Sequence, residues 1–221
     1  MILSHDLRTP LASITGSLSS LLDVETHLDP ETRRDLLRTA YEEADRLNRL
    51  VGNLLDMTRV QAGALKLTPQ PCDLQDLIGV ALQHFNLTLR QRPVKVELPP
   101  NLPLVPLDFV LMTQVLVNLL DNALKYSPPE SPLEIKVEPH DREIQLHLTD
   151  SGPGIPPADL PHVFDKFYRS QQVNRIRGTG LGLAISKGIV EAHGGKIRLD
   201  NRPSGGTAAT ITLLLAEEKH D

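Results

Sequence analysis

Near its start the chain carries the stretch His5-Asp6-Leu7-Arg8-Thr9-Pro10-Leu11. This stretch predicts a helix on which the imidazole of His5 stands beside the carboxylate of Asp6. The hydroxyl of Thr9 follows four residues later, so it lies on the same helix face as His5, one turn on. Pro10 then predicts an interruption of the helix, because proline lacks the N–H that a helical hydrogen bond needs. A histidine, a carboxylate and a hydroxyl in this arrangement can carry nucleophilic and acid–base chemistry.

Apolar residues around this stretch follow helical spacing. From Leu3 to Leu21 they recur every three or four residues, which predicts a helix over residues 1 to about 24. Asp29 followed by Pro30 predicts the start of a second helix, with Asp29 as the N-cap.

The second helix carries a heptad seam of apolar residues between Leu37 and Thr58, and Gly63 is a candidate C-cap. Two helices with one apolar stripe each cannot make a stable core alone. We therefore expect a homodimer in which two hairpins form a four-helix bundle. Taken without the His5 stretch, the same seam would suit a plain coiled coil that does no chemistry.

The remaining sequence predicts a mixture of helices and antiparallel strands, which favours an α+β fold with one layer of helices on one sheet. Pro69 and Pro71 mark a linker before it. We expect a helical hairpin at 1–65, a linker at 66–72, an α/β sandwich at 73–217 and a tail at 218–221. The helices are expected at 73–89, 109–126 and 179–193, and the strands at 94–98, 133–138, 143–150, 196–201 and 207–215.

Composition excludes some classes of function. The chain has 221 residues, with 23 basic and 28 acidic side chains and a net charge of −5, which argues against a nucleic-acid partner. The single cysteine, Cys72, excludes an internal disulfide and a cysteine-built zinc site. No apolar stretch reaches the ~18 residues of a membrane span, and no signal peptide is visible. We expect a cytoplasmic location and no direct membrane contact for this segment.

The expected helix from Phe109 carries a polar stripe on an otherwise apolar helix. Gln114, Asn118, Asn122 and Lys125 are spaced by four, four and three residues. Solvated faces usually carry glutamate and lysine, so two asparagines in register suggest a ligand. Amide oxygens are hard ligands that suit Mg²⁺ bridging phosphates, and Lys125 adds a cation for phosphate.

Two glycine-rich segments follow. Asp150-Ser-Gly152-Pro-Gly154 ends a predicted strand, and by itself it would be read as an ordinary turn. Gly178-Thr179-Gly180-Leu181-Gly182 opens a predicted helix, whose backbone amides favour phosphate. A dinucleotide fingerprint has similar glycines, but it needs a preceding parallel strand, whereas a polar, basic segment at 170–177 precedes this one. That segment is expected to form a mobile lid, with Phe164 and Phe167 anchoring it to the core.

The His5 stretch, the Asn118–Lys125 stripe, the Asp150 segment and the Gly178 segment, in that order, resemble the transmitter core of two-component sensor histidine kinases. The resemblance extends over nearly the whole chain. It implies a dimerisation and phosphotransfer hairpin followed by an ATP-binding domain of the gyrase/Hsp90/histidine kinase/MutL type. It also implies a response regulator receiver domain as partner, since the chain contains no receiver pattern of its own.

The resemblance also implies roles for individual residues. His5 is the phosphoacceptor, Asp6 orients it, and the hydroxyl of Thr9 serves dephosphorylation of the partner. Asn122 with Asn118 holds Mg²⁺, and Asp150 accepts a hydrogen bond from the adenine amino group of ATP. The remaining nucleotide-binding candidates are Lys125, Tyr126, Gly152, Gly154, Arg175, Arg177, Gly178, Thr179, Gly180, Leu181, Gly182 and Thr207.

Local phrases narrow the resemblance to the potassium-responsive Kdp-type sensor kinases. They are residues 3–10, 53–63, 164–167 and 201–206, and Asp6 stands where many relatives carry glutamate. Because such kinases carry sensing segments before the phosphoacceptor, we expect a core cut from a longer protein linked to the inner or plasma membrane.

Two other functions stay open on the sequence. An ATPase or serine kinase could use the same nucleotide fold, but it would need neither the His5 stretch nor the heptad hairpin. A degenerate kinase could dimerise and hold nucleotide without transferring phosphate, but it would not need every expected site residue.

Overall fold

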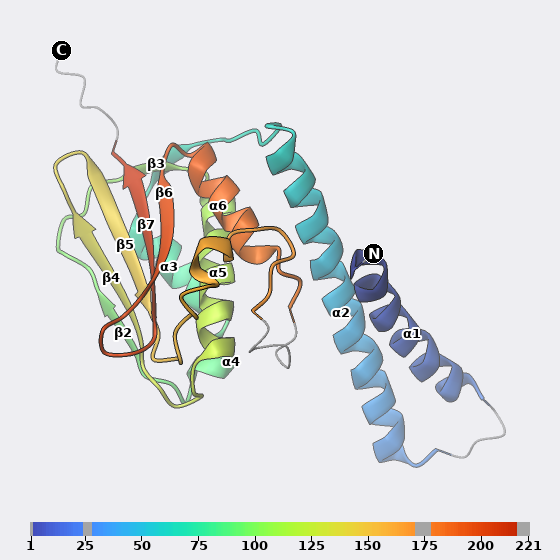
Figure 1. The fold of residues 1–221 in the computed structure, drawn as a ribbon. Helices are drawn as coiled ribbons and strands as arrows, with labels where there is room; N and C mark the ends of the chain where they lie inside the picture. Colours follow the sequence, from blue (N-terminus) through green and yellow to red (C-terminus); the bar gives the residue numbers. More distant parts are fainter. Residues whose placement is uncertain (1, 24–27, 171–177, 216–221) are drawn as a thin grey trace. The chain divides into compact units, whose positions relative to one another are not determined.

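The computed structural model describes residues 2–23, 28–170 and 178–215, with side chains from Leu7 onward (Figure 1). The chain divides into two compact units, Met1–Thr58 and Arg59–Asp221. Among the described residues, no helix is both long and apolar enough to cross a membrane.

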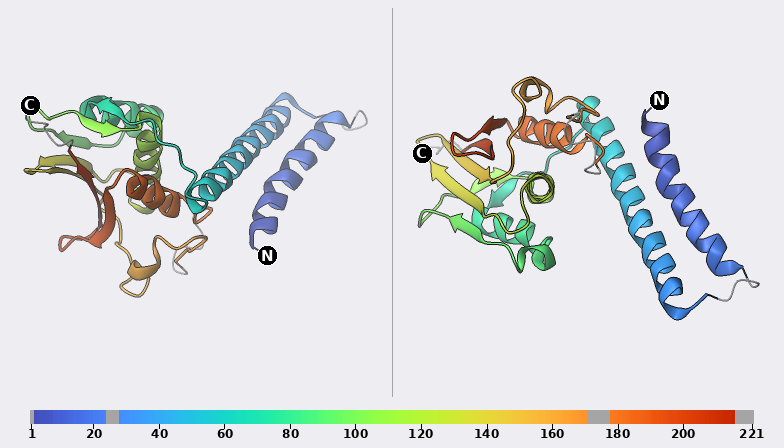
Figure 2. Two further views of the ribbon diagram at one scale, coloured as in Figure 1. Left: turned by 90° about the horizontal axis from the view of Figure 1, so that it is seen from above. Right: turned by 60° about the horizontal axis from the view of Figure 1, so that its bottom comes forward.

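The first unit is a helical hairpin. Helix α1 runs from Ile2 to Leu22 and α2 from Pro30 to Gln61, and the two lie side by side and antiparallel (Figure 2). The predicted cap is confirmed, because Asp29 Oδ1 accepts from the backbone N–H of Glu31 at 3.0 Å and of Thr32 at 2.9 Å. These bonds satisfy amides that the first helical turn leaves without a partner.

The predicted interruption at Pro10 is wrong. Helix α1 continues through Pro10, whose side chain is buried, as far as Leu22. Proline removes one helical hydrogen bond, but the bonds before and after it remain. An uninterrupted α1 keeps His5 and Thr9 on one helix at the predicted spacing.

The hairpin leaves much of its apolar surface open in a single chain. Ala40 and Leu50 are buried, whereas three leucines and a valine of the predicted stripes, and a fourth leucine beside them, are exposed by 44% or more. The exposed ones are Leu11 at 54%, Leu18 at 44%, Leu37 at 52%, Val51 at 44% and Leu55, beside the seam, at 52%. Such a surface is what a hairpin that pairs with a second copy would present.

A five-stranded sheet forms the frame of the second unit, in the order β2-β4-β5-β7-β6. The β2–β4 pair is parallel, and the other pairs are antiparallel. Side chains along β4 and β5 alternate between buried and more exposed, as expected for a sheet covered on one face. The strands are β2 Val94–Glu97, β4 Leu133–Pro139, β5 Glu143–Thr149, β6 Lys196–Asn201 and β7 Thr207–Leu214.

Three helices cover one face of this sheet, as Figures 1 and 2 show. They are α3 Leu74–Gln83, α5 Phe109–Tyr126 and α6 Gly182–Ala192. Fully buried apolar side chains from helices and strands meet between the layers, among them Leu77, Leu120, Ile185, Leu146 and Ile211. The predicted α+β arrangement of one helical layer on one sheet is therefore confirmed.

Some elements differ from their predicted limits. The helix expected from Asp73 to Leu89 is two helices, α3 and α4 Asn86–Leu89, with Phe85 outside helical backbone geometry. The last helix begins at Gly182 instead of Thr179, because Gly180 has a left-handed backbone (φ +68°).

A second, two-stranded sheet was not predicted. Strand β1, Gln70–Cys72, pairs antiparallel with β3, Val105–Leu107. The first of these strands lies in the expected linker at 66–72. A short 3-10 helix, η1 Leu160–His162, follows β5 in the chain.

Candidate nucleotide and phosphoacceptor sites

Helix α1 places the predicted phosphoacceptor residues at one end of the hairpin. His5 and Asp6 lie within the helix, but their side chains fall outside the described residues. The side chain of Thr9 is exposed, one turn beyond His5. A hydroxyl at this position is accessible to a partner protein.

Asn118 and Asn122 on α5 are both half-buried, and Asn118 faces the start of α6. Its Nδ2 donates to the carbonyl of Gly182 at 3.3 Å and to Ser186 Oγ at 3.4 Å. These bonds tie the polar stripe of α5 to the glycine segment that begins α6. They engage the amide nitrogen and leave Oδ1, the atom that suits a hard cation, out of both bonds.

The end of α5 carries Lys125 and Tyr126. Lys125 Nζ pairs with the carboxylate of Asp121, one turn earlier, and both side chains are about 40% exposed. A phosphate at Lys125 would therefore compete with Asp121 for the ammonium group. Burial raises the pKa of the Tyr126 phenol above its ordinary value, and Asp121 adds to the rise while Arg169 opposes it.

Asp150 is a buried carboxylate at the end of β5, with 7% of its surface exposed. Its Oδ1 accepts from the backbone N–H of Gly152 at 2.7 Å and of Thr207 at 3.2 Å. Oδ2 takes part in neither bond. The carboxylate is thus held in one orientation with an acceptor oxygen remaining for a ligand N–H donor.

Gly152 brings the end of α5 against the Asp150 segment. A Cβ at this position would lie 2.7 Å from the carbonyl oxygen of Tyr126 and 2.9 Å from Asp150 Oδ1. No residue but glycine fits there without movement of the backbone. Tyr126, Asp150, Gly152 and Thr207 are therefore neighbours, as the sequence predicted for parts of one nucleotide site.

The second glycine segment bonds to Phe167, which precedes the predicted lid in the chain; residues 171–177 of that lid lie outside the described residues. The N–H of Phe167 donates to the carbonyl of Gly180 at 2.9 Å, and a Cβ on Gly180 would meet the Phe167 backbone at 2.7 Å. Phe167 itself is 38% exposed, so it anchors this segment through its backbone and not by burying its ring. Arg175 and Arg177 lie outside the described residues.

Thr179 and Leu181 have local structural roles. Thr179 Oγ1 accepts from the N–H of Leu181 at 3.1 Å, and the Leu181 side chain is fully buried. Gly178 is exposed, with open space where a side chain would stand. Among these predicted contacts, Leu181 can therefore reach a ligand through its backbone but not through its side chain.

Sequence reasoning missed three residues that surround the predicted site. Arg92 is 6% exposed, and its guanidinium donates to Ser127 Oγ and, at 3.0 Å, to Ser131 Oγ beyond the end of α5. Asn201 and Arg202 bond to the loop that follows Asp150. No local pattern signals these contacts, because each joins segments at least 35 residues apart.

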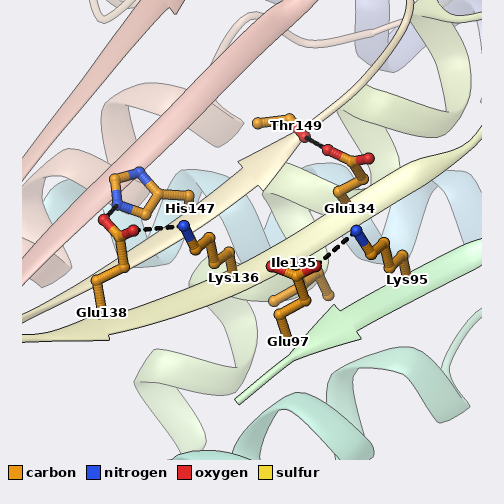
Figure 3. A pocket seen from close by; sticks show the side chains of 8 residues that line it. All are labelled: Lys95, Glu97, Glu134, Ile135, Lys136, Glu138, His147 and Thr149. Carbon is orange, nitrogen blue, oxygen red and sulfur yellow. Dashed lines mark hydrogen bonds and ion pairs between the residues drawn. The ribbon is translucent and has the colours of Figure 1, made fainter. Parts of the chain in front are cut away.

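A hollow of about 280 Å³ lies on the outer face of the sheet (Figure 3). One of its lining residues, Glu134, pairs with Arg202 at 3.7 Å. The other lysines and glutamates pair within the hollow: Lys95 with Glu97 at 2.5 Å, and Lys136 with Glu138 at 2.5 Å. His147 lies 3.3 Å from Glu138. This is the pattern of a solvated sheet face, with no unmatched charge that would call for a ligand.

Comparison with known proteins assigns both units. Residues 2–63 match the family model of the His Kinase A (phospho-acceptor) domain, and residues 108–217 match the histidine kinase-, DNA gyrase B- and HSP90-like ATPase model. The structure is similar to that of the histidine kinase AdeS of Acinetobacter baumannii, with a TM-score of 0.75 and 28% identity. That likeness covers 96% of this chain and 98% of the chain in the AdeS structure.

Two relatives are similar in sequence. The sensor protein KdpD of Clostridium acetobutylicum is 40% identical over 206 residues, which are 92% of this chain and 23% of KdpD. The histidine-protein kinase/phosphatase MprB of Mycolicibacterium smegmatis is 34% identical over 224 residues, which cover 97% of this chain and 44% of MprB. The chain thus spans less than half the length of either relative. With a phosphoacceptor hairpin and an ATPase-type domain matched in that order along one chain, the protein belongs to the sensor histidine kinase family.

Proposed function

We propose that this chain transfers the γ-phosphoryl group of ATP to its own His5 and then to an aspartate of a response regulator. The observation that carries the proposal is the meeting of separate motifs around α5. Asn118 bonds to the start of α6, and the end of α5 touches the Asp150 loop through Gly152. A phosphoacceptor hairpin precedes this cluster in the same chain.

On this proposal the buried carboxylate of Asp150 recognises the adenine base. Oδ1 is held by Gly152 and Thr207, so Oδ2 can accept from the adenine amino group. Guanine presents an oxygen at that edge, and a carboxylate has no proton to donate to it. Thr207 lies beside Asp150 and is the second residue proposed on the adenine side.

Mg²⁺ and the phosphates belong, on this proposal, to α5 and the start of α6. The amide oxygens of Asn122 and Asn118 fit a hard cation, and the bonds that hold the Asn118 amide nitrogen favour this use of its oxygen. Bound Mg²⁺ would neutralise charge on the phosphates. Lys125, Arg175, Arg177 and the backbone amides at 178–182 are proposed to hold the phosphates.

The phosphoryl step follows from histidine chemistry. A neutral imidazole nitrogen of His5 forms a bond to the γ-phosphorus as the bond from that phosphorus to the β–γ bridging oxygen breaks, and ADP leaves. Asp6 holds the proton on the other ring nitrogen, so the imidazole keeps its orientation and its developing positive charge is balanced. Transfer to the regulator's aspartate then frees His5.

Thr9 is proposed to act in the reverse direction. Its exposed hydroxyl, one turn from His5, can position a water molecule against the regulator's phospho-aspartate. The relative MprB is named as a kinase/phosphatase, which describes such a pair of activities in that protein.

We further propose a homodimer formed through the hairpins, with 1–65 as the phosphotransfer domain, 66–72 as a linker, 73–217 as the ATP-binding domain and 218–221 as a tail. Similarity to KdpD supports a Kdp-type kinase whose full-length protein is membrane-linked and responds to potassium. This segment would then lie in the cytoplasm.

The experiment that tests this function is labelling with γ-³²P-ATP and Mg²⁺, followed by acid and alkali treatment of the labelled chain. A phosphohistidine is lost in acid and kept in alkali. A serine kinase would give the opposite stability, an ATPase would release phosphate without labelling the chain, and a degenerate kinase would bind nucleotide and do neither. Any of these three results would contradict the proposal.

A further inference from the structure

The turn between β6 and β7, residues 201–206, is bonded to the loop at 150–155, which we call the Asp150 loop. Asn201 Oδ1 accepts from the backbone N–H of Ile155 at 2.7 Å, and Asn201 Nδ2 donates to the Ile155 carbonyl at 2.7 Å. Two bonds to one residue's backbone fix both the position and the orientation of that segment, as a neighbouring strand would. The end of the Asp150 loop is thereby held to β6.

The other end of the loop is bonded to the same turn and to the start of β7. Arg202 Nη1 donates to the carbonyl of Asp150 at 3.2 Å. The N–H of Asp150 donates to the Thr207 carbonyl at 3.0 Å, and the N–H of Thr207 donates to Asp150 Oδ1 at 3.2 Å. Both the backbone and the carboxylate of Asp150 are therefore fixed from this side.

Two glycines with left-handed backbones make the close approach possible. A Cβ on Gly206 (φ +89°) would lie 2.0 Å from the carbonyl oxygen of Asp150, and one on Gly154 (φ +78°) would lie 2.8 Å from Asn201 Oδ1. These positions account for glycine in both segments by contact between them.

We propose that Asn201, together with Arg202, is a positioning residue that holds the Asp150 loop in its nucleotide-binding geometry before ATP arrives. This inference rests on the proposed function, because it takes Asp150 as the adenine contact. A loop that is already ordered does not lose conformational freedom on binding, so affinity is higher than for a loop that must order. Because Asn201 bonds to the loop that carries the proposed adenine contact, it should govern ATP binding more than the transfer step.

The test compares Asn201→Ala with Ser204→Ala, an exposed residue of the same turn, in the full 221-residue chain. Asn201→Ala should raise the KM for ATP in His5 labelling about tenfold, with the rate at saturating ATP within about twofold of wild type. Ser204→Ala should leave both unchanged. Arg202→Met removes the donor at the other end of the loop and should shift the KM in the same direction.

Amide exchange gives a readout that does not depend on labelling. Without nucleotide, the Ile155 N–H should exchange slowly in wild type and in Ser204→Ala, and faster in Asn201→Ala. An unchanged KM in Asn201→Ala, whether or not its thermal stability falls, would overturn the inference and leave the proposed function standing. If instead wild type fails to bind or use ATP, the proposed function fails and the inference fails with it, even where the Ile155 amide behaves as expected.

Discussion

At the scale of single residues, the site depends on how Asp150 is buried. This carboxylate is 7% exposed, and two backbone N–H groups that donate to Oδ1 stabilise it. Its other oxygen, Oδ2, still needs a donor, which a bound ligand can supply. Asparagine has the same shape and can keep Oδ1 as an acceptor for Gly152 and Thr207. In place of Oδ2, however, it presents an NH₂ group.

Asp150→Asn should therefore weaken ATP binding while the chain stays folded. The loss of a hydrogen bond to a charged acceptor is worth about 1.5–3 kcal/mol, or roughly ten- to a hundredfold in affinity. Titration with ATP and with GTP measures both affinity and base selectivity, and selectivity for ATP should fall. Wild-type curves for the variant with both nucleotides would remove Asp150 from the site.

Arg92 supports the same region from within the core. Burial lowers the pKa of its guanidinium, an effect that the nearby charge of Asp150 partly opposes. Arg92→Ala leaves the buried Ser127 hydroxyl and the half-buried Ser131 hydroxyl without the guanidinium donor, and it removes a large side chain from a buried position.

We expect Arg92→Ala to lower the free energy of unfolding by about 2–4 kcal/mol. Urea unfolding measures the change, and Arg90→Ala, an exposed arginine two residues earlier, serves as the control that should change it little. Equal stability of the two variants would show that the bonds to the serines contribute nothing.

At the scale of elements, the sequence predicts helix starts well where a cap is local. Asp29, Asp73 and Asp108 each accept from amides two or three residues later, so the signal and the structure lie in one short segment. The late start of α6 is different, because Gly180 turns left-handed where the Phe167 backbone crosses it.

Elements that depend on distant partners escaped prediction. Strands β1 and β3 have three residues each, contain proline, and exist because Cys72 pairs with Val105 across 33 positions. For the same reason the sequence does not predict the contact of Asn201 with Ile155, which lies 46 residues away in the chain.

Helix α5 should show a pH dependence set by its N-cap. Burial alone would raise the pKa of Asp108, but hydrogen bonds from the Leu111 N–H and from the N–H and hydroxyl of Thr68, with the nearby His193, hold that pKa below its ordinary value. A carboxyl with a lowered folded pKa stabilises the protein above its unfolded pKa of about 3.9 and loses that contribution as pH falls through the folded value.

The difference in unfolding free energy between wild type and Asp108→Asn should therefore be flat above about pH 5 and shrink below about pH 4. Urea unfolding at a series of pH values measures it. A difference that grows in acid would mean that the ionised Asp108 is not a stabilising cap.

At the scale of the whole molecule, the hairpin needs a partner surface. Leu37 and Val51 of the predicted seam are about half exposed in one chain. Each such side chain contributes about 1.5–3 kcal/mol when it is fully buried. Burying these side chains between two hairpins therefore makes a large favourable contribution to the free energy of dimerisation.

We expect sedimentation to show a dimer, and the double variant Leu37→Glu/Val51→Glu to raise its dissociation constant by at least about a hundredfold. Arg38→Glu changes the charge on the charged face of α2, at a side chain that is 76% exposed, and should leave the dimer intact. Dissociation by Arg38→Glu alone, or a dimer that survives the double variant, would place the interface elsewhere.

The role of His5 as phosphoacceptor is tested by labelling His5→Gln with γ-³²P-ATP, with His140→Gln, an exposed histidine of the second unit, as control. We predict that His5→Gln binds ATP as wild type does and takes up no acid-labile label, whereas His140→Gln labels normally. Acid-labile label that persists on His5→Gln would show that the phosphoryl group goes to another residue and that His5 is not the phosphoacceptor.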